Sequence, residues 1–272
     1  MSAATKTPGT IRVGVGGWTF APWRNNFYPA GWPHSRELEY ASRRLSAIEV
    51  NGTFYRLQSA ATFAKWRDET PQDFAFSLKA PRFVTHRRVL AEAGESVQRF
   101  LASGLAELAH KLGPIVWQFE PSKRFDPGDL EAFLKLLPQQ LGSLPLRHAL
   151  DVRHASFATA EYLALARRFG VATVFTESDE HPAIADITGD FVYCRLMRHD
   201  VTLPEGYAAA TLDGLAACAQ AWRSGEEPLG VPHVEAQAAP AMPRDVFMHF
   251  IGGAKQVAPA AAMALRKRLV DA

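Results

Sequence analysis

The sequence predicts an α/β fold, a single (β/α)8 barrel of the TIM type. Two observations lead to this prediction: the length of the chain, and eight short apolar runs that alternate with helical patterns. The chain has 272 residues, and barrels of this kind usually have about 250. Hydrophobic residues make up 47% of the chain and charged residues 21%. This composition is that of an ordinary globular protein and excludes a disordered or fibrous chain.

Eight short runs are rich in apolar residues and have the length of buried strands. They comprise residues 11–18, 47–54, 74–80, 115–120, 147–154, 172–177, 191–197 and 246–251. Helical patterns occupy residues 35–46, 60–69, 94–112, 127–137, 159–169, 212–222 and 255–270. Strands that alternate with helices predict a parallel sheet, and eight of them predict its closure into a barrel.

The boundaries of the fold follow from the same reading. We expect one barrel domain over residues 11–270, preceded by a disordered tail over residues 1–10. Residues 224–244 contain four prolines and no apolar periodicity. We expect them to form a long loop within the domain, of a length that is usually functional or mobile.

Within the predicted strands, apolar residues alternate with small or polar ones. In residues 47–54, for example, Ile48 and Val50 alternate with Glu49 and Asn51. Alternate residues of a barrel strand face the helices and the interior, so the apolar set should pack under the helices. The other set begins small and ends polar or charged along most strands. We therefore expect a tightly filled bottom and a polar C-terminal mouth.

Enzymes with this fold place their active sites at the C-terminal ends of the strands. The candidate catalytic residues there are Glu49 and Asp151, which we expect to transfer protons. The candidate ligand-binding residues are Asn51, Tyr55, Lys79, His86, Gln118, Arg153, His154, Tyr193 and Arg195. Among these, Lys79, Arg153 and Arg195 should converge on an anion, since the planar guanidinium group suits phosphate and carboxylate.

Polar groups inside a barrel are costly unless they pair with one another or meet a ligand. An internal ion-pair network and a ligand site that uses this network therefore both stay open. Glu177 also stands at a strand end, and we include it among the groups that could act as an acid or base.

Three functions fit such a mouth. The first is an enzyme that acts on a phosphorylated or otherwise anionic small molecule by acid–base chemistry. The second is a protein that binds or processes nucleic acid at an abasic site or another lesion, with Arg82, Arg87 and Arg88 near the phosphates. The third is a non-catalytic binding or scaffold barrel. The net charge of +2 weakens the second, and the density of inward polar groups weakens the third. Whether the protein is an enzyme stays open.

The sequence does not favour a metal centre or a membrane partner. His86, His154 and His249 could join carboxylates around a divalent metal, but no His-x-His or His-x3-His spacing supports such a site. The cofactor is left open. Cys194 and Cys218 lie in apolar runs, as small core residues do. No run approaches 18 apolar residues, and the first ten contain no apolar segment of a signal peptide. We expect a cytoplasmic location.

Several short segments together resemble the YecE-like family, a domain-of-unknown-function family. Residues 48–57 read Ile-Glu-Val-Asn-Gly-Thr-Phe-Tyr-Arg-Leu. Gly-Gly-Trp at 16–18, Phe-Tyr-Pro at 27–29, Trp-Gln-Phe at 117–119, Val-Arg-His at 152–154 and Tyr-Cys-Arg-Leu at 193–196 also match. The similarity covers residues 11–196 and implies a TIM-type barrel.

The resemblance implies no settled activity. A distant likeness to abasic-site endonucleases and sugar isomerases of barrel fold has been proposed for the family, and it is an analogy of fold alone. The family's last strand commonly ends in an aromatic residue followed by Asn or Asp. Here residues 249–253 read His-Phe-Ile-Gly-Gly, so we expect no role for amide or acidic side chains at that position.

Overall fold

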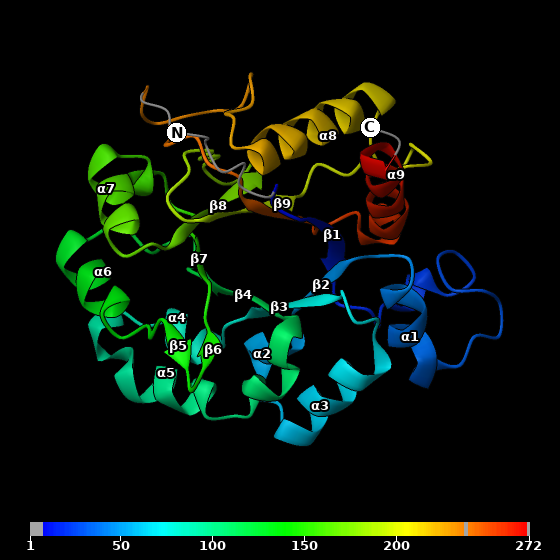
Figure 1. The fold of residues 1–272 in the computed structure, drawn as a ribbon, viewed down its shortest axis with the longest axis horizontal. Coiled ribbons are helices and arrows are strands. Elements are labelled where there is room, and N and C mark those ends of the chain that lie inside the picture. Colours follow the sequence, from blue (N-terminus) through cyan, green and yellow to red (C-terminus); the bar gives the residue numbers. More distant parts are fainter. Residues whose placement is uncertain (1–7, 237–238, 271–272) are drawn as a thin grey trace, which may run out of the picture.

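The computed structural model describes residues 8–236 and 239–270. Eight parallel strands close into a barrel in the order β1-β10-β9-β8-β7-β4-β3-β2, with helices on the outside (Figure 1). The strands are β1 (Ile11–Gly16), β2 (Ala47–Val50), β3 (Ala75–Lys79), β4 (Leu112–Gln118), β7 (His148–Asp151), β8 (Ala172–Glu177), β9 (Phe191–Leu196) and β10 (Asp245–Phe250). The predicted single TIM-type barrel is confirmed.

The described helices follow the strands around the barrel. They are α1 (Glu37–Ser42), α2 (Gly52–Tyr55), α3 (Ala60–Glu69), α4 (Arg82–Thr85), α5 (Gly94–Leu101), α6 (Pro127–Leu134), α7 (Ala160–Arg168), α8 (Ala209–Ser224) and α9 (Ala258–Val270). The side chains of Ser59, Asp126 and Thr159 accept hydrogen bonds from the first turns of α3, α6 and α7. Such N-caps satisfy amide groups that a helix end leaves unpaired.

The helix predicted over residues 94–112 is divided in two. The first part is α5, and a 3-10 segment, Leu105–Lys111, forms the second. Gly104 separates them with a φ of 106°, in the left-handed region that a side chain disfavours. A Cβ atom there would also lie 2.6 Å from the Cα of Ala60. The glycine thus ends the helix and lets α3 approach.

A second difference from the prediction concerns the turn after β2. The strand predicted over residues 47–54 ends at Val50, and residues 52–55 form α2 instead. The alternation of inward and outward side chains therefore stops before Tyr55. A small antiparallel hairpin, β5 (Gln140–Leu141) with β6 (Leu144–Pro145), was also not predicted.

The barrel interior confirms the predicted alternation of side chains. Its lower part is a buried cluster formed by Ala47, Ala75, Val116, Ala149, Ala172, Val174, Phe191, Tyr193 and Phe247. The outward set, including Ile48, Leu78 and Leu150, belongs to the larger cluster under the helices. Each such side chain contributes about 1.5–3 kcal/mol when fully buried. Gly14 permits the close contact of β1 with β2, because a Cβ atom there would lie 1.9 Å from the carbonyl oxygen of Ala47.

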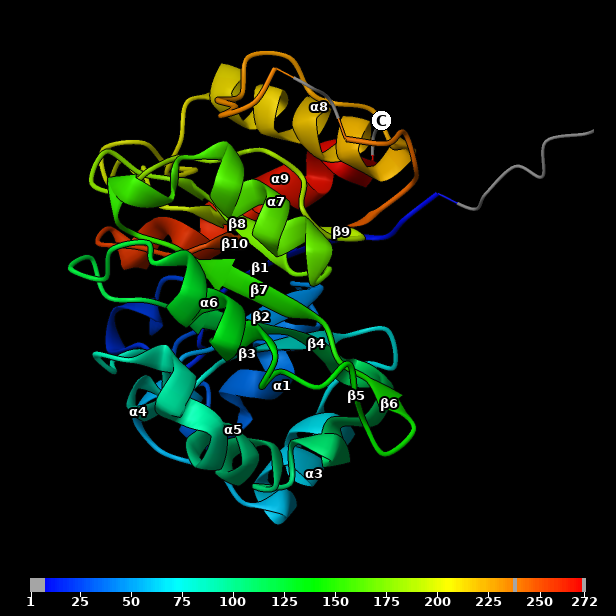
Figure 2. The same ribbon diagram turned by 90° about the vertical axis from the view of Figure 1, so that its left-hand side faces the viewer.

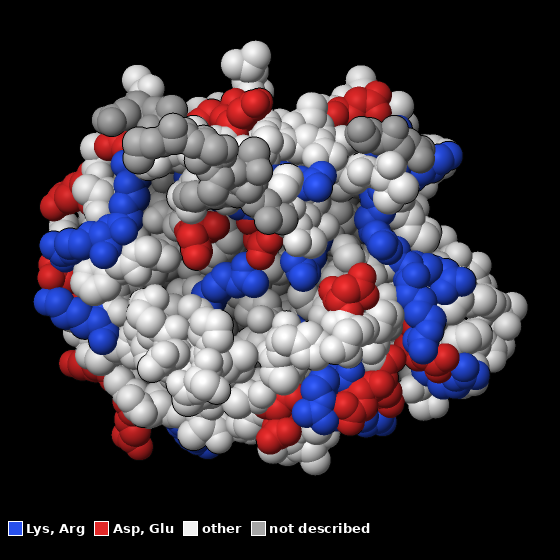
Figure 3. Space-filling model, viewed as in Figure 1, with Lys and Arg blue, Asp and Glu red and all other residues white. Residues whose placement is uncertain are grey.

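The two ends of the barrel differ in character. Figure 1 looks onto the N-terminal ends of the strands, and in Figure 2 the strands run from right to left, toward the C-terminal mouth. On the N-terminal face, basic and acidic side chains are interspersed (Figure 3). A pocket of about 880 Å³ lies at this face, and Arg147, Arg244 and Asp245 are among its lining residues.

The long loop before β10 first runs along the outside of α8, where residues 226–231 lie beside Thr211, Leu215 and Cys218, and then reaches the N-terminal face of the barrel. Its backbone amides at Val234 and Glu235 donate to the carboxylate of Asp186 at 2.7 and 3.0 Å. Pro240 and Met242 line the pocket at the N-terminal face. The loop therefore does not cover the mouth along its described length; residues 237–238 lie outside the described residues, as do residues 1–7 of the predicted tail.

Candidate functional site

Inward side chains from seven strands lie in the upper part of the barrel, toward its mouth. They are Glu49 on β2, Ser77 on β3, Gln118 on β4, Asp151 on β7, Thr176 on β8, Arg195 on β9 and His249 on β10. The strand register places them as neighbours: Glu49 pairs with Ser77, Gln118 with Asp151, and Arg195 with both Thr176 and His249. The period-two alternation of each strand is what turns these polar residues inward.

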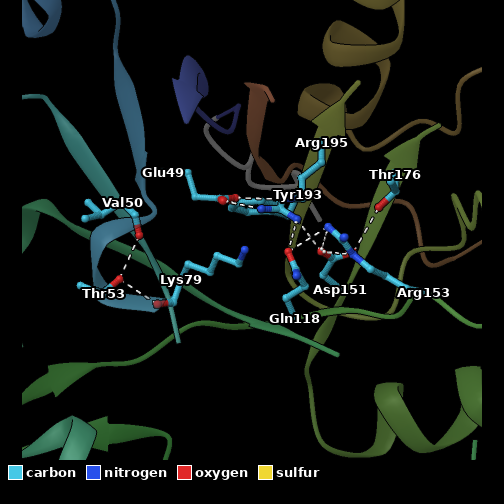
Figure 4. A network of polar contacts seen from close by, with 10 residues as sticks. All are labelled: Glu49, Val50, Thr53, Lys79, Gln118, Asp151, Arg153, Thr176, Tyr193 and Arg195. Atoms are coloured by element: carbon cyan, nitrogen blue, oxygen red, sulfur yellow. Dashed lines mark hydrogen bonds and ion pairs between the residues drawn. The ribbon is translucent and has the colours of Figure 1, made fainter. Parts of the chain in front are cut away.

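Arg195 is the centre of a buried network of polar contacts (Figure 4). Its Nε and Nη2 atoms donate to the two carboxylate oxygens of Glu49 at 3.1 and 2.5 Å. Its Nη1 atom donates to Asp151 at 2.5 Å and to Gln118 at 2.8 Å. Arg195 is 1% exposed, and both carboxylates are fully buried.

The pKa values of this network are set by burial and by the ion pairs together. Burial alone would raise the pKa of Glu49, but the charge of Arg195 and its hydrogen bonds lower it to about 2. Burial alone would lower the pKa of Arg195, but the charges of Glu49 and Asp151 raise it instead. Both groups therefore stay ionised at neutral pH.

Arg153 extends the network to the rim of the mouth. Its Nε and Nη2 atoms donate to Asp151 at 3.2 and 3.1 Å, and Nη2 also donates to Gln118 at 2.8 Å. The side chain of Arg153 is 14% exposed, so its guanidinium group lies between the buried network and the solvent.

Lys79 points into the same mouth without an anionic partner (Figure 4). Its Nζ atom lies 3.9 Å from the centre of the Phe54 ring. Over residues 8–236 and 239–270, no hydrogen bond or ion pair of this ammonium group is present. Burial, and then the charge of Arg195, lower the pKa of Lys79 to about 8, although Glu49 acts in the opposite direction.

Tyr193 and His249 close the floor of the site. The Tyr193 hydroxyl donates to Glu49 at 2.8 Å, and the His249 ring stacks on the Tyr193 ring with centres 5.0 Å apart. His249 is fully buried, and neither ring nitrogen has a hydrogen-bond partner among the described residues. Burial lowers its pKa to about 4, so its ring is neutral near pH 7.

The other predicted ligand-binding residues lie at the rim. Asn51 precedes α2, His86 contacts Glu120 at 3.1 Å, and the His154 side chain accepts from the Ser156 amide at 3.1 Å. Tyr55 is 67% exposed and stands apart from the network, because the turn into α2 carries it out of the strand alternation. The structure thus unites Glu49, Asp151, Lys79, Gln118, Arg153, Tyr193 and Arg195, and it places Asn51, Tyr55, His86 and His154 around or beyond them.

A second cluster at the end of β8 includes residues that sequence reasoning did not find. Glu177 accepts a hydrogen bond of 2.7 Å from the Tyr207 hydroxyl, and burial raises the pKa of this carboxyl. The His199 ring packs on Tyr207 and Phe250. Tyr207 and His199 come from the connection between β9 and α8. No periodicity in the sequence indicates which way such a connection runs.

No group of three or more His, Cys, Asp or Glu side chains within the described parts of the chain is arranged to hold a metal ion. Both cysteines are free, Cys194 buried and Cys218 partly buried. None of the helices seen between residues 8 and 270 has the length and apolar character needed to cross a membrane.

The fold and the strand-end network define a TIM-barrel protein with a charged, largely buried C-terminal mouth. Residues 12–271 match the family model described as "Protein of unknown function DUF72". The chain belongs to this family, which confirms the resemblance inferred from its short segments.

Two curated relatives are similar over part of their length. UPF0759 protein YecE of Escherichia coli is 29% identical over 136 residues, which are 46% of this chain and 47% of that protein. UPF0759 protein YunF of Bacillus subtilis is 29% identical over 153 residues, 54% of this chain and 52% of that protein. The chain thus matches about half the length of these relatives.

Solved structures of the family share the fold across nearly the whole chain. A DUF72 family protein from Thermotoga maritima superposes with a TM-score of 0.70 at 21% identity, covering 97% of this chain and 100% of that one. One from Enterococcus faecalis superposes with a TM-score of 0.68 at 16% identity, covering 96% and 98%. At such identities the likeness shows the fold alone.

Proposed function

We propose that the mouth binds an anionic small molecule and that the protein is an enzyme acting on it by acid–base chemistry. One observation carries the proposal: in the buried network together with Lys79, the positive charges outnumber the negative ones. Arg195, Arg153 and Lys79 are cationic, whereas Glu49 and Asp151 are the carboxylates that face them. One positive charge is left over, and a bound anion neutralises it.

An internal ion-pair network explains only part of this arrangement. It accounts for Arg195, whose donors meet Glu49, Asp151 and Gln118. It does not account for Lys79, whose ammonium group has no acceptor in the described structure, or for the two unpaired nitrogens of His249. Buried polar groups normally find partners, so these side chains support a ligand in addition to the network.

The proposed roles follow from the position of each group. Lys79 and Arg153 hold the anion, since both reach the mouth and carry charge that the two carboxylates do not cancel. Glu49 and Asp151 were predicted to transfer protons, and in this proposal they also fix the orientation of Arg195. Glu49 is a weak base, because its pKa is about 2. Lys79, with a pKa of about 8, changes its charge close to neutral pH and is the better candidate for proton transfer.

A nucleic-acid ligand is the second candidate, and the structure lends it less support. Arg87 lies near the mouth, but its guanidinium donates to the Phe83 carbonyl at 3.0 Å and to the Ser96 hydroxyl at 2.7 Å. It therefore holds the chain together after β3. Arg88 and Arg124 line a neighbouring pocket of about 810 Å³ that also contains acidic residues, which reduce its attraction for phosphates.

A thermal-shift panel tests the proposal. It contains phosphate, pyrophosphate, sugar phosphates, dicarboxylates, and short DNA with and without an abasic site. A ligand at 100 times its dissociation constant stabilises the protein by about 2.7 kcal/mol, enough to raise Tm by several degrees. We expect a shift with small anions that is lost in Arg153→Met and Lys79→Met.

The matched control is Arg168→Met, which removes a surface arginine that pairs with Glu131 at 2.7 Å outside the mouth. This variant should keep the full shift. Shifts confined to abasic DNA would support the nucleic-acid candidate. If small anions shift all four proteins equally, they bind elsewhere and the proposed site is wrong.

A further inference from the structure

Lys79 differs from Lys111 and Lys123, two other partly or fully buried lysines of the barrel. Lys111 donates to the carbonyl oxygens of Arg67 and Thr70 at 2.5 and 2.7 Å, and Lys123 pairs with Asp129 at 2.9 Å. The Lys79 ammonium group instead faces an aromatic ring and the guanidinium groups of the mouth. Lys79 is 8% exposed.

Such surroundings suit an amine that reacts as a nucleophile. Only the neutral amine attacks carbon, and desolvation beside other cations increases the neutral fraction of a lysine. A pKa of about 8 leaves about half of the amine neutral at pH 8, whereas an ordinary lysine with a pKa of about 10.4 is almost fully protonated there.

We propose that Lys79 forms a Schiff base with an aldehyde or ketone that carries a carboxylate or phosphate group. The inference rests on the proposed function, because Arg153, at the rim of the same mouth, would hold the anionic group of this substrate. Lys79 stands at the C-terminal end of β3, where the barrel places reacting groups. It adds a reaction class and a substrate class to a site otherwise defined by charge alone.

The condensation is balanced without any further reagent. The neutral amine adds its electron pair to the carbonyl carbon, and the carbonyl oxygen takes up the proton that the nitrogen loses. The carbon–oxygen bond of this carbinolamine then breaks as the oxygen takes a second proton and leaves as water. The ammonium form of Lys79 and the carbonyl compound thus yield a protonated imine and water, with one positive charge on each side.

The charges around Lys79 also suit the product. Glu49 and Asp151 both act on Lys79 in the direction that favours its charged form, and a protonated imine carries the same charge as the ammonium group. The positive charge on the imine can therefore persist beside the carboxylates, while Arg153 remains available for the anionic group.

Reductive trapping tests the inference on the whole protein. The protein is incubated at pH 8 with glyoxylate, with pyridoxal 5′-phosphate, or with propionaldehyde, each in the presence of cyanoborohydride. Hydride adds to the imine carbon and fixes the substituent as a secondary amine. Peptide mass spectrometry then gives the extent of labelling at every lysine. Glyoxylate and pyridoxal phosphate distinguish a carboxylate from a phosphate as the recognised group, and propionaldehyde lacks both.

Lys255 is the internal control in the same digest. Burial lowers its pKa too, and its Nζ atom lies over Phe20 and Trp23 at 5.0 and 5.7 Å. It resembles Lys79 in burial and aromatic contact but is not part of the Arg195 network. Lys79→Arg keeps the positive charge of the mouth and removes the reactive amine.

We expect Lys79 to be labelled about tenfold or more faster than Lys255 by at least one anionic carbonyl compound, because Arg153 would hold that compound beside the amine. Propionaldehyde should not show this preference, and excess pyrophosphate should suppress the labelling. Equal labelling of the two lysines by the anionic compounds overturns the inference.

The failures of the two proposals can be told apart. If pyrophosphate still shifts the Tm of the wild type and of Lys79→Arg but Lys79 is not trapped, the anion site stands and the Schiff base is wrong. If Lys79 is trapped equally by propionaldehyde and no anion shifts the Tm, the anion site and the substrate class are both wrong.

Discussion

Removal of Arg195 is the perturbation that the described network makes most consequential. Arg195→Met deletes the guanidinium group and keeps much of the apolar stem. The carboxylate of Glu49 then loses both of its short contacts to the arginine, at 2.5 and 3.1 Å, and retains the Tyr193 hydroxyl. Asp151 keeps the guanidinium of Arg153. Glu49 is therefore the charge left without an ionic partner.

The cost follows from the burial of both groups. Arg195 and Glu49 are at most 1% exposed, and removing one partner of such a pair costs about 3–5 kcal/mol. For a protein of this size, each kcal/mol lowers Tm by about 2 °C. We expect Arg195→Met to melt roughly 6–10 °C below the wild type at pH 8.

Arg195→Met should also reverse the pH dependence of the stability that Glu49 contributes. In the wild type, Glu49 has a pKa of about 2, below the ordinary value of about 4.3. It contributes stability above the ordinary pKa that is lost as pH falls toward 2. Without Arg195, burial raises the pKa instead, so the penalty is present at neutral pH and is relieved as pH falls through the raised value. The stability gap between the two proteins should narrow from pH 8 to pH 5.

Thermal melting at pH 8 measures the first effect and urea unfolding at pH 8 and pH 5 the second, with Arg168→Met as the surface control. Arg168 is 56% exposed in its side chain, and its loss should leave Tm nearly unchanged. If Arg195→Met unfolds at the wild-type urea concentration at pH 8, the carboxylates do not depend on Arg195 and the account of the network is wrong.

Four further variants test other features of the structure. Tyr193→Phe removes the hydrogen bond to Glu49 and should lower the free energy of unfolding by about 1.5–3 kcal/mol; a loss below the error of urea titration contradicts that bond. Gly14→Ala places a Cβ atom 1.9 Å from a carbonyl oxygen of β2 and should destabilise the protein by about 1–3 kcal/mol or more. Gly214 has open space around it in α8, so Gly214→Ala should stabilise the protein by up to about 1 kcal/mol. Differential scanning calorimetry compares the two variants. His249 has a pKa of about 4, below the ordinary value of about 6.5, so its contribution to stability is present above pH 6.5 and is lost as pH falls toward 4. Between pH 6.5 and pH 4 the wild type should therefore lose on the order of 1–3 kcal/mol more of its free energy of unfolding than His249→Phe does. Parallel pH profiles of the two proteins contradict this.

Much of the barrel could be predicted because strands carry a strict alternation. That period placed Glu49, Asp151 and Arg195 on inward faces and at the same ends of their strands, and the structure brings them into contact. Beyond the end of a strand, the alternation no longer predicts which way a side chain points. Tyr55 follows the last residue of β2 by a helical turn, so its predicted place in the mouth depended on a strand that is shorter than expected.

The remaining differences have causes that a single sequence hides. Gly104 breaks a continuous helical pattern because α3 approaches it, and this is a tertiary contact between segments far apart in the chain. The hydrogen bond of Tyr207 to Glu177 depends on the path of a connection. His249 was visible as an inward residue of the last strand, but its lack of partners became apparent only once Tyr193 and Glu49 surrounded it.

The most direct test of the proposed anion site is the titration of Lys79 itself. Its ¹³Cε resonance, assigned by its loss in Lys79→Arg, is followed by NMR from pH 6 to pH 11 with and without pyrophosphate. The account predicts a pKa of about 8 in the free protein and a rise when the anion neutralises the surplus charge. A pKa close to the ordinary value of about 10.4, unchanged by the anion, would contradict the claim that the mouth carries an unbalanced positive charge.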